Sequence, residues 1–438
     1  MSRLARHFLP TGSVLDLEEI VQAGLCIGCG LCQSIAGAER VRLIATRDGR
    51  ERPVALRSLD HATLEAIDAV CPGVRVGAIE RSRLAPGTPT DPIWGPIARI
   101  AIAHASDPEI RFRGASGGVL TALAELLLRR AEVQFILHVA PLANRPLRSG
   151  RQVSLSRRAL LQAAGSRYGP AAALIDLCRL LDRGETFAVV GKPCDISALR
   201  NLAHRDPRVD AQMRYALAMV CGGASELTKS SEVLEGLGIA EAELKLFRYR
   251  GHGNPGSVRV ETLDGRAHEL SYMDMWADES RWRIQPRCRI CPDALGEAAD
   301  IVAADCWDGG FPSSENDGFN AVIVRTSRGS ELFEAALSEG ALTVVRDITP
   351  RDMDRFQPHQ IAKKRALWPR LLGLRLAGHP APRARRLRLR RLALATSPRA
   401  FVAEALGARR RARSDRLTER SPLPEGPTLT DSWVQPDP

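Results

Sequence analysis

The sequence lacks any long uninterrupted hydrophobic run, and this excludes a simple membrane-spanning helix. The longest apolar stretch, residues 117–128, is interrupted by Thr121 and Glu125, whereas a membrane span needs about 18 or more apolar residues in succession. The first residues include Arg3 and Arg6 but no apolar segment of the kind found in secretory signal peptides. We therefore expect a cytoplasmic protein.

Aromatic residues are also scarce, at 5% of the 438 residues. Proteins that read nucleic acids usually show stacking aromatics or a helix-turn-helix, and neither pattern is present in this sequence. No conventional catalytic triad, pair of catalytic carboxylates or internal repeat can be recognised. These absences argue against specific nucleic-acid binding and indicate that bound cofactors carry out the chemistry.

Cysteine, in contrast, is present ten times, with spacings typical of metal binding in a reducing compartment rather than of a disulfide framework. Cys26, Cys29 and Cys32 form a compact triplet, and Cys71 is followed by proline. Three thiolates spaced in this way plus a distant Cys-Pro are typical ligands of a 4Fe–4S cluster. Zinc is the alternative, although zinc sites usually combine two separated Cys-x2-Cys or Cys/His pairs.

Four further cysteines lie far apart in the sequence: Cys194, Cys221, Cys288 and Cys291. The first two follow predicted strands, and the last two form a single Cys-x2-Cys pair. Because ligands gather at the carboxyl ends of parallel strands, these residues are candidates for a second metal site. The alternative from spacing alone is a set of buried or redox-active thiols.

A glycine-rich segment precedes a predicted helix over residues 119–130. It contains Ala115, Ser116, Gly117 and Gly118, and Arg111 and Arg113 come just before it. Free N–H groups at a helix start, together with the helix dipole, attract anions. The sequence therefore predicts an anion site here, and an ordinary turn capped by serine is the alternative.

The order of the expected elements divides the chain into five parts. Residues 1–85 are expected to form a small ferredoxin-like α+β module, and the Pro- and Gly-rich residues 86–96 a linker. Alternating strands and helices then predict an α/β core with a parallel or mixed sheet. Residues 97–170 are expected to form the N-terminal part of this core, and residues 171–374 its C-terminal part with the second cysteine site. Residues 375–438 are expected to be a basic, partly disordered tail.

Most elements can be placed from their apolar patterns. In the module, a hairpin is expected over residues 41–56, followed by a helix over residues 59–70 that delivers Cys71 and has Asp60 as its N-cap. In the core, the expected strands are residues 97–106, 133–139, 186–191, 215–220, 300–308 and 320–326, and the expected helices are residues 119–130, 160–164, 171–181 and 331–338. An antiparallel insertion is expected over residues 247–270, with its turn at Asp264-Gly265.

The positive charge is concentrated near the end of the chain. Residues 383–420 hold 13 arginines against three acidic residues, so they carry +10 of the net charge of +11. Leucines alternate with arginines over residues 385–394. Such a segment is either a basic amphipathic helix that contacts an anionic membrane surface or an acidic partner, or a solvated disordered tail.

The ordered combination of these motifs resembles one family. The segments are Cys26-x2-Cys29-Gly-x-Cys32, Cys71-Pro72, Arg113-Gly-Ala-Ser-Gly-Gly118, Gly191-Lys-Pro-Cys194, Cys221-Gly222, Cys288-x2-Cys291-Pro-Asp293 and Ala299-Asp-Ile301. Their order is similar to that of the beta subunits of coenzyme F-420-reducing hydrogenases and dehydrogenases. This family also contains 7-hydroxymethyl chlorophyll a reductase and a ferredoxin-dependent divinyl chlorophyllide 8-vinyl reductase. The resemblance covers residues from about 20 to 345.

The resemblance implies an iron–sulfur flavoprotein with FAD and one or two 4Fe–4S clusters. Residues 115–118 would help to hold the flavin, and Cys194, Cys221, Cys288 and Cys291 would bind the inner cluster. Asp305 and Arg325 match a later family segment near the flavin. Lys192 is a departure, because the family often has threonine or phenylalanine there. It either places a positive charge near a reduced cofactor or is solvated.

From these observations we expect an oxidoreductase that passes electrons through its clusters to FAD for the two-electron reduction of a small organic substrate. The main alternative is an electron-transfer subunit that works between a ferredoxin-like donor and a partner oxidoreductase subunit, or with a deazaflavin. A cluster-bearing nucleic-acid sensor is a third alternative, motivated only by the basic tail. The substrate itself cannot be read from the sequence.

Overall fold

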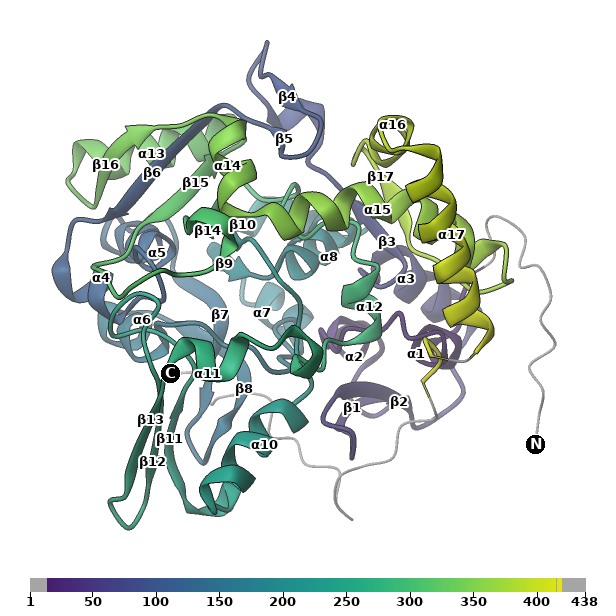
Figure 1. Ribbon diagram of the computed structural model, residues 1–438, viewed down its shortest axis with the longest axis horizontal. Coiled ribbons are helices and arrows are strands. Elements are labelled where there is room, and N and C mark those ends of the chain that lie inside the picture. Colours follow the sequence, from purple (N-terminus) through teal and green to yellow (C-terminus); the bar gives the residue numbers. More distant parts are fainter. Residues whose placement is uncertain (1–13, 415, 420–438) are drawn as a thin grey trace.

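A mixed sheet of eight strands forms the centre of the computed structural model, which describes residues 14–414 and 416–419 (Figure 1). In spatial order the strands are β16 (Leu342–Asp347), β6 (Arg99–Ala105), β15 (Asn320–Val324), β14 (Ile301–Asp305), β10 (Met213–Met219), β9 (Phe187–Gly191), β7 (Phe135–Leu142) and β8 (Arg145–Ser154). The four strands β14, β10, β9 and β7 run parallel to one another, and the flanking strands pair antiparallel. The predicted α/β core with a mixed sheet is thus confirmed.

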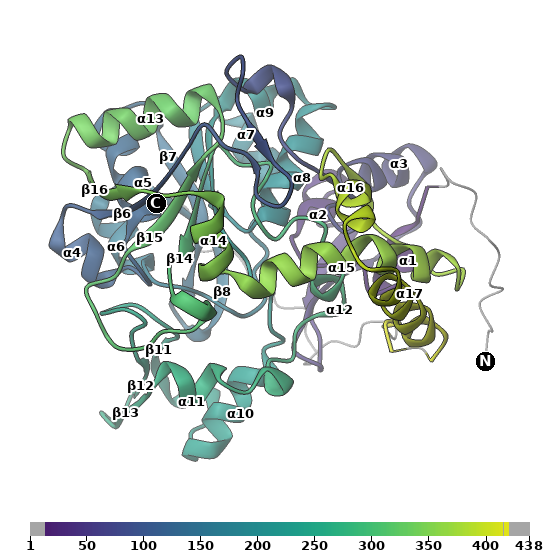
Figure 2. The ribbon, with the colours of Figure 1, turned by 45° about the horizontal axis from the view of Figure 1, so that its top comes forward.

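Helices cover both faces of this sheet (Figures 1 and 2). One face packs against α4 (Pro108–Arg113), α5 (Val119–Arg129), α6 (Arg157–Ala163) and α13 (Ser327–Ser338). The other packs against α7 (Leu177–Asp182), α8 (Pro193–Ala203), α9 (Pro207–Gln212) and α14 (Pro350–Phe356). In β10, Tyr215 and Leu217 enter the first core while Ala216 and Ala218 enter the second, as the two-residue period of a strand requires.

The first cysteines lie in a separate small module. Its elements are α1 (Leu17–Gln22), α2 (Leu31–Ala36), β1 (Val41–Ala45), β2 (Glu51–Ala55), α3 (His61–Val70), β3 (Arg75–Gly77) and the short helix η1 (Arg81–Arg83). Strands β1 and β2 pair antiparallel, and the Asp60 carboxylate accepts a hydrogen bond of 2.8 Å from the Thr63 N–H at the start of α3. The predicted hairpin, helix and N-cap are therefore confirmed.

The second half of the segment expected to form a linker is packed into the core instead, because residues 93–96 are buried. The expected linker contains the short strands β4 (Thr90–Asp91) and β5 (Gly95–Pro96). Between them, the Trp94 side chain is fully buried, and its indole N–H donates to the Asp354 carboxylate at 2.8 Å. Burial of this large aromatic side chain stabilises the segment. The proline and glycine content of the segment is typical of a linker and gives no sign of this packing.

A lobe beside β8 contains the predicted insertion. Strands β11 (Leu244–Arg248), β12 (Val258–Thr262) and β13 (Ala267–Leu270) form an antiparallel sheet. It packs with α10 (Thr228–Leu237) and α11 (Tyr272–Trp276) around its own small core. The remaining short elements are η2 (Glu241–Glu243), η3 (Glu279–Arg281), α12 (Pro286–Arg289) and η4 (Asp308–Gly310).

The helix expected over residues 171–181 is wrong in its first half, because α7 begins only at Leu177. Residues 171–176 run past the first cysteine loop, where the Leu174 N–H donates to the Cys29 carbonyl at 2.9 Å. The apolar pattern of residues 171–175 shows that the segment is buried, but it does not show that the segment is held by this long-range hydrogen bond instead of forming a helix.

The prediction of a partly disordered tail from residue 375 is wrong for residues 376–414, which form a strand and two helices. Helix α15 (Pro358–Arg375) is followed by β17 (Arg383–Arg385), α16 (Leu389–Leu394) and α17 (Pro398–Arg413). Strand β17 pairs parallel with β3 of the small module. In both views the yellow end of the ribbon lies beside the purple module (Figures 1 and 2).

The physical reason is that three of the four leucines between the arginines pack against the rest of the chain. Leu387, Leu389 and Leu392 are buried, and this burial outweighs the local charge. Residues 420–438, the rest of the predicted tail, lie outside the described residues. No helix in the described part of the chain has both the length and the apolarity that a membrane span needs.

Candidate functional site

The first cysteine set comprises Cys26, Cys29, Cys32 and Cys71. The first three lie in and just after the loop between α1 and α2, and Cys71 directly follows α3. Gly28 and Gly30 both have positive φ. A Cβ on Gly30 would lie 2.8 Å from the Cβ of Ile175. Only glycine allows this close turn of the backbone.

All four thiols of this set line one small apolar cavity between Leu17, Leu43 and Ile67. The Gly28 N–H donates to the Cys26 sulfur at 3.4 Å. Burial raises the pKa of each thiol, and repulsion between neighbouring thiolates adds to this at Cys29, Cys32 and Cys71, where the pKa of Cys71 reaches about 12. Without a metal these groups are uncharged thiols near neutral pH, and a positively charged metal centre would favour their thiolate form.

Thiols are the soft donors that a 4Fe–4S cluster uses, and such a cluster also accepts hydrogen bonds at its sulfurs. Among the described residues, no group of three or more His, Cys, Asp or Glu side chains is arranged to hold one ion.

The second cysteine set comprises Cys194, Cys221, Cys288 and Cys291, and the fold brings these residues together. Cys194 lies in the first turn of α8, Cys221 follows β10, and the other two lie in α12 and just after it. Burial raises the pKa of Cys221 to about 12, with Cys288 as the next cause, and both Cys221 and Cys291 act on Cys194. The Ala224 N–H donates to the Cys288 sulfur at 3.4 Å.

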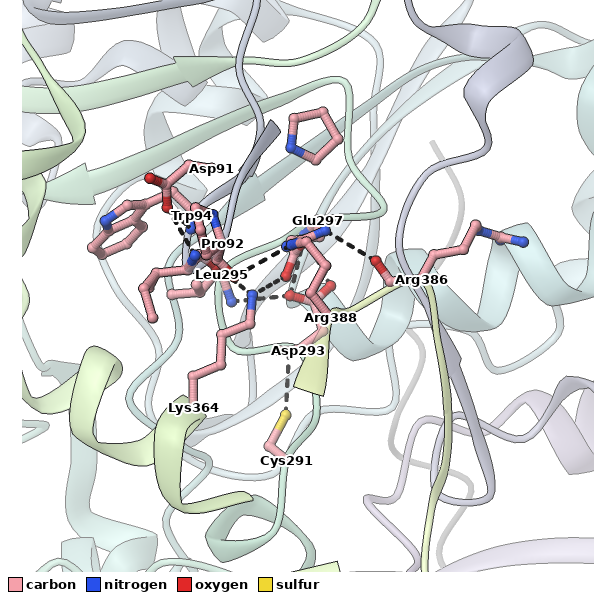
Figure 3. A network of polar contacts seen from close by, with 12 residues as sticks. Asp91, Pro92, Trp94, Cys291, Asp293, Leu295, Glu297, Lys364, Arg386 and Arg388 are labelled. Atoms are coloured by element: carbon pink, nitrogen blue, oxygen red, sulfur yellow. Dashed lines mark hydrogen bonds and ion pairs between the residues drawn. The ribbon is translucent and has the colours of Figure 1, made fainter. Parts of the chain in front are cut away.

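A buried ionic network fixes the loop that follows Cys291 (Figure 3). The Asp293 carboxylate accepts from the Glu297 N–H at 2.9 Å. The fully buried Glu297 carboxylate accepts from both Lys364 of α15 and Arg388, just before α16. Burial acts to raise the pKa of Glu297, but these two cations hold it below its ordinary value. The C-terminal segment therefore supports the second cysteine set.

Arg287 connects the two cysteine sets. Its side chain is 1% exposed and donates to the carbonyls of Pro72 at 2.7 Å and Gly73 at 3.1 Å, directly after Cys71. Because Arg287 itself belongs to α12, next to Cys288, one guanidinium holds both ligand loops at a fixed separation.

A large pocket opens at the carboxyl ends of β9, β10 and β14. Its walls include residues 114–116 and 118–121, the loop over residues 163–169, and Cys221. The space between these walls, including the part open to solvent, is about 1500 Å³. Ligands in open α/β sheets bind at this edge, so the pocket is the candidate site for an organic cofactor or substrate.

Most of the predicted flavin-site residues lie at this pocket. Ala115, Ser116, Gly118, Lys192 and Asp305 all line it. Gly117 packs behind the lining, where a Cβ would lie 2.8 Å from the Asn320 nitrogen. The Ser116 hydroxyl donates to the Asp305 carboxylate. The Val119 N–H at the helix start is already hydrogen-bonded to Asn320, which leaves fewer free donors than the sequence indicates.

Three predicted arginines do not line the pocket. Arg111 donates to the Gly318 carbonyl at 2.9 Å and lies over the Phe319 ring, and Arg113 forms an ion pair with Glu109. Arg325 is fully buried and donates to the carbonyls of Trp94, Pro96 and Leu295. All three hydrogen bonds of the Arg325 guanidinium go to backbone carbonyls, so the role of this side chain is structural.

Sequence reasoning missed Arg250, which is 2% exposed and lines the pocket. Its guanidinium donates to Asp305 and to the Tyr168 hydroxyl, each at 3.1 Å, and to the Ala115 carbonyl. It also lies 4.7 Å from the centre of the Trp307 ring. A single arginine in an inserted lobe carries no motif, so no signal in the sequence marks it.

Comparisons of the sequence with known proteins identify its family. Residues 100–179 match the family profile described as "Coenzyme F420 hydrogenase/dehydrogenase, beta subunit N-term", and residues 184–349 match the corresponding profile of the C-terminal part of the same beta subunits. Together the two matches span more than half of the chain. The chain belongs to this family. The resemblance drawn from the motifs is therefore confirmed.

Three relatives show the range of the family. A coenzyme F420-dependent sulfite reductase from Methanocaldococcus jannaschii is 26% identical over 361 residues, covering 78% of this chain and 51% of its own. The coenzyme F420 hydrogenase subunit beta from Methanosarcina barkeri is 23% identical, covering 57% of this chain and 82% of its own. The F420-dependent formate dehydrogenase 1 subunit beta from Methanococcus maripaludis is 24% identical, covering 54% and 59%.

The chain thus spans about half of the length of the sulfite reductase that it matches. Among solved structures, a chain of the F420-reducing [NiFe] hydrogenase complex from Methanosarcina barkeri aligns with a TM-score of 0.48 and 20% identity, over 63% of this chain and 95% of that chain. All three relatives are oxidoreductases or oxidoreductase subunits named for coenzyme F420, and oxidoreductase chemistry is the coarse function that membership in this family shows.

Proposed function

We propose that the chain is an electron-transfer subunit of a larger oxidoreductase that links a one-electron partner to coenzyme F420. The observation that carries the proposal is the position of Cys221, which belongs to the second cysteine set and also lines the large pocket. A centre held by the second set would therefore adjoin a ligand in the pocket. Family membership supports this subunit function over a self-contained FAD reductase of an organic substrate.

When bound, 4Fe–4S clusters would supply one-electron transfer and a flavin or deazaflavin would supply hydride transfer. The chain's own residues hold these centres in a fixed order: first set, second set, pocket. Arg287 ties the loop after Cys71 to α12. Lys192 stands at the border of the second set and the pocket, where its ammonium pairs with Asp195 at 2.8 Å.

Coenzyme F420 is the first candidate for the pocket, because the names of all three relatives contain it. FAD, the cofactor implied by the sequence motifs, remains the second candidate. In either case Arg250 would hold the pocket wall in place, since it binds both Asp305 and the Ala115 carbonyl. The partner subunit, the electron donor and any further substrate belong to this proposal as well.

The proposal is tested on anaerobically purified, fully loaded protein. Iron and sulfide should each be near eight per chain, the sum of two 4Fe–4S clusters of about four irons each. With a chemical reductant such as dithionite, added F420 should lose its absorbance, and extracted flavin should identify any FAD. Iron near four with no reaction of F420 would contradict the proposal.

The pocket assignment has its own test. Ala164 lines the pocket, so the bulky side chain of Ala164→Trp should block the ligand while iron content stays unchanged. Ala211→Trp on the exposed surface of α9 is the matched control. If Ala164→Trp binds F420 or flavin as well as the control does, the ligand lies elsewhere.

A further inference from the structure

The outer face of α17 has an unusual composition. Arg399, Val402, Leu406, Arg410 and Arg413 recur every three or four residues along the helix, so they share one side of it. All five are exposed, with Val402 at 52% and Leu406 at 55%. Together with the exposed Arg390, Arg391 and Leu394 of α16, these residues are called the basic face below.

Among the described residues, no ion pair involves an arginine of the basic face. Residues 376–414 contain eleven arginines and one acidic residue, Glu404, whose carboxylate is paired with Arg370 of α15 at 2.8 Å. Arg383, Arg386 and Arg388 pair with carboxylates outside this range. The arginines of the basic face therefore create a positive potential that attracts an acidic macromolecule.

The basic face lies next to the first cysteine set. The inner side of α17, with Ala405, Ala408 and Ala412, is buried, and the last two belong to the core cluster that contains Cys26. Just beyond α17, the Leu417 carbonyl lies against Gly24, where a Cβ would come within 2.2 Å of it. Helix α17 thus packs on the module, and the segment just after the helix contacts Gly24, which precedes the first cysteine by two residues.

A membrane surface does not fit this helix. An interfacial helix inserts its apolar side into the lipid, but the apolar sides of α16 and α17 are already used. Leu389 and Leu392 of α16 are buried, and α17 packs along α15 and the module. What remains outside is a mixed surface of arginine and a few apolar side chains, which is typical of a contact between proteins.

We propose that the basic face docks an acidic one-electron carrier protein, such as a ferredoxin, beside the first cysteine set. This inference rests on the proposed function, because the first set would receive or donate the electron. In the forward direction the carrier's reduced centre loses one electron and the chain's oxidised cluster gains it, with no bond made or broken. Arginine charge would steer the encounter, and the apolar side chains would hold the complex.

Binding is measured directly, without relying on turnover. The probe is an acidic ferredoxin, added to the full loaded chain at increasing salt in a calorimeter. The triple variant Arg399→Glu, Arg410→Glu and Arg413→Glu should weaken binding at low salt by at least about tenfold, since it reverses three charges within a screening length of the partner. For the wild type, affinity should fall steeply as salt rises.

The matched control changes the same charge elsewhere. Arg158, Arg214 and Lys245 are exposed on the core and on the inserted lobe, so their replacement by glutamate should leave ferredoxin affinity within about twofold. Replacing Val402 and Leu406 by serine should weaken binding at high salt more than at low salt. If both charge-reversal triples weaken binding equally, the effect is net charge and the basic face is not the docking site.

Two further readouts separate this inference from the proposed function. F420 reduction by dithionite should be the same in the wild type and the basic-face triple, whereas reduction by ferredoxin should fall only in the triple. A wild type with full iron and dithionite activity that does not bind ferredoxin would overturn the docking site alone. Binding to vesicles of anionic phospholipid, with no binding to ferredoxin, would overturn it in favour of a membrane.

Discussion

The two cysteine sets reach similar environments by opposite routes. The first is built within one small module, where three ligands lie inside seven residues and the fourth ends a helix. The second is collected from α8, the end of β10 and α12, nearly one hundred residues apart at the extremes. A local site depends on backbone geometry, while a dispersed site depends on the surrounding fold. Substitutions should therefore disrupt the two cysteine sets in different ways.

The largest expected effect is the separate loss of each centre. Cys29→Ser replaces a soft thiolate by a poor iron ligand, so we expect loss of about four irons per chain. Cys221→Ser should remove a different group of about four. Cys178→Ser in α7, which belongs to neither set, is the control and should keep all iron. Iron counts with paramagnetic resonance of the reduced proteins measure this, and unchanged iron in either ligand variant refutes that set.

The next effect should appear only at the dispersed set. Glu297→Gln removes the carboxylate that neutralises the buried Lys364 and Arg388 (Figure 3). Breaking a buried ion pair from one side costs about 3–5 kcal/mol. We expect this loss in the free energy of unfolding, measured in urea, with release of iron from the second set first. The exposed pair of Glu334 with Arg99 provides the control, and Glu334→Gln should cost less than about 1 kcal/mol.

The same variant has a pH signature. The pKa of Glu297 is lowered in the folded protein, so this carboxylate stabilises the fold above its ordinary pKa of about 4.5. That contribution is lost as the pH falls through the lower, folded value. Wild-type stability should therefore decline more steeply below about pH 4.5 than that of Glu297→Gln. Parallel acid-unfolding curves for the two proteins would show that Glu297 is not ionised in the fold.

The contrast between the sets also explains what the sequence could predict. The spacing of Cys26, Cys29 and Cys32 is local, so the first set was predicted in full. Cys194 and Cys221 follow strands whose apolar runs are easy to recognise, so their meeting at one sheet edge could be anticipated. The resemblance to a family added Cys288 and Cys291, whose pair alone indicates little.

What could not be predicted depends on long-range packing. Arg325 fits a binding role by its charge, yet it serves three backbone carbonyls in the core. Arg250 reaches the pocket only because the inserted lobe folds against β8 and β14. The arginine-rich segment has the composition of a solvated tail, but its leucines face α15 and the module. Charge and composition are local properties, whereas these contacts join different helices, strands and loops, up to 231 positions apart in the case of Arg325 and Trp94.

A third prediction tests whether the two sets are linked. Arg287→Met keeps the volume of the side chain but leaves the carbonyls of Pro72 and Gly73 without their donor. Each unpaired buried carbonyl costs about 1–3 kcal/mol, so for these two carbonyls we expect a loss of about 2–6 kcal/mol in the free energy of unfolding. The change touches both ligand loops, and both clusters should become easier to remove with a chelator. Loss confined to one set would show that Arg287 supports that set alone.

The smallest effect distinguishes the backbone of the local site from that of the dispersed one. Gly30→Ala places a Cβ at positive φ and 2.8 Å from Ile175, which should cost about 1–3 kcal/mol. Gly222→Ala, one residue after Cys221, meets no atom within 4 Å and has no positive φ, so stability should change by less than about 0.5 kcal/mol. The first set should then lose iron more readily in Gly30→Ala, while Gly222→Ala keeps wild-type iron content and rate of iron loss. Equal behaviour of the two variants would mean that the first loop tolerates a change in its turn, and that packing by Ile175, rather than the glycine backbone, determines the position of its thiols.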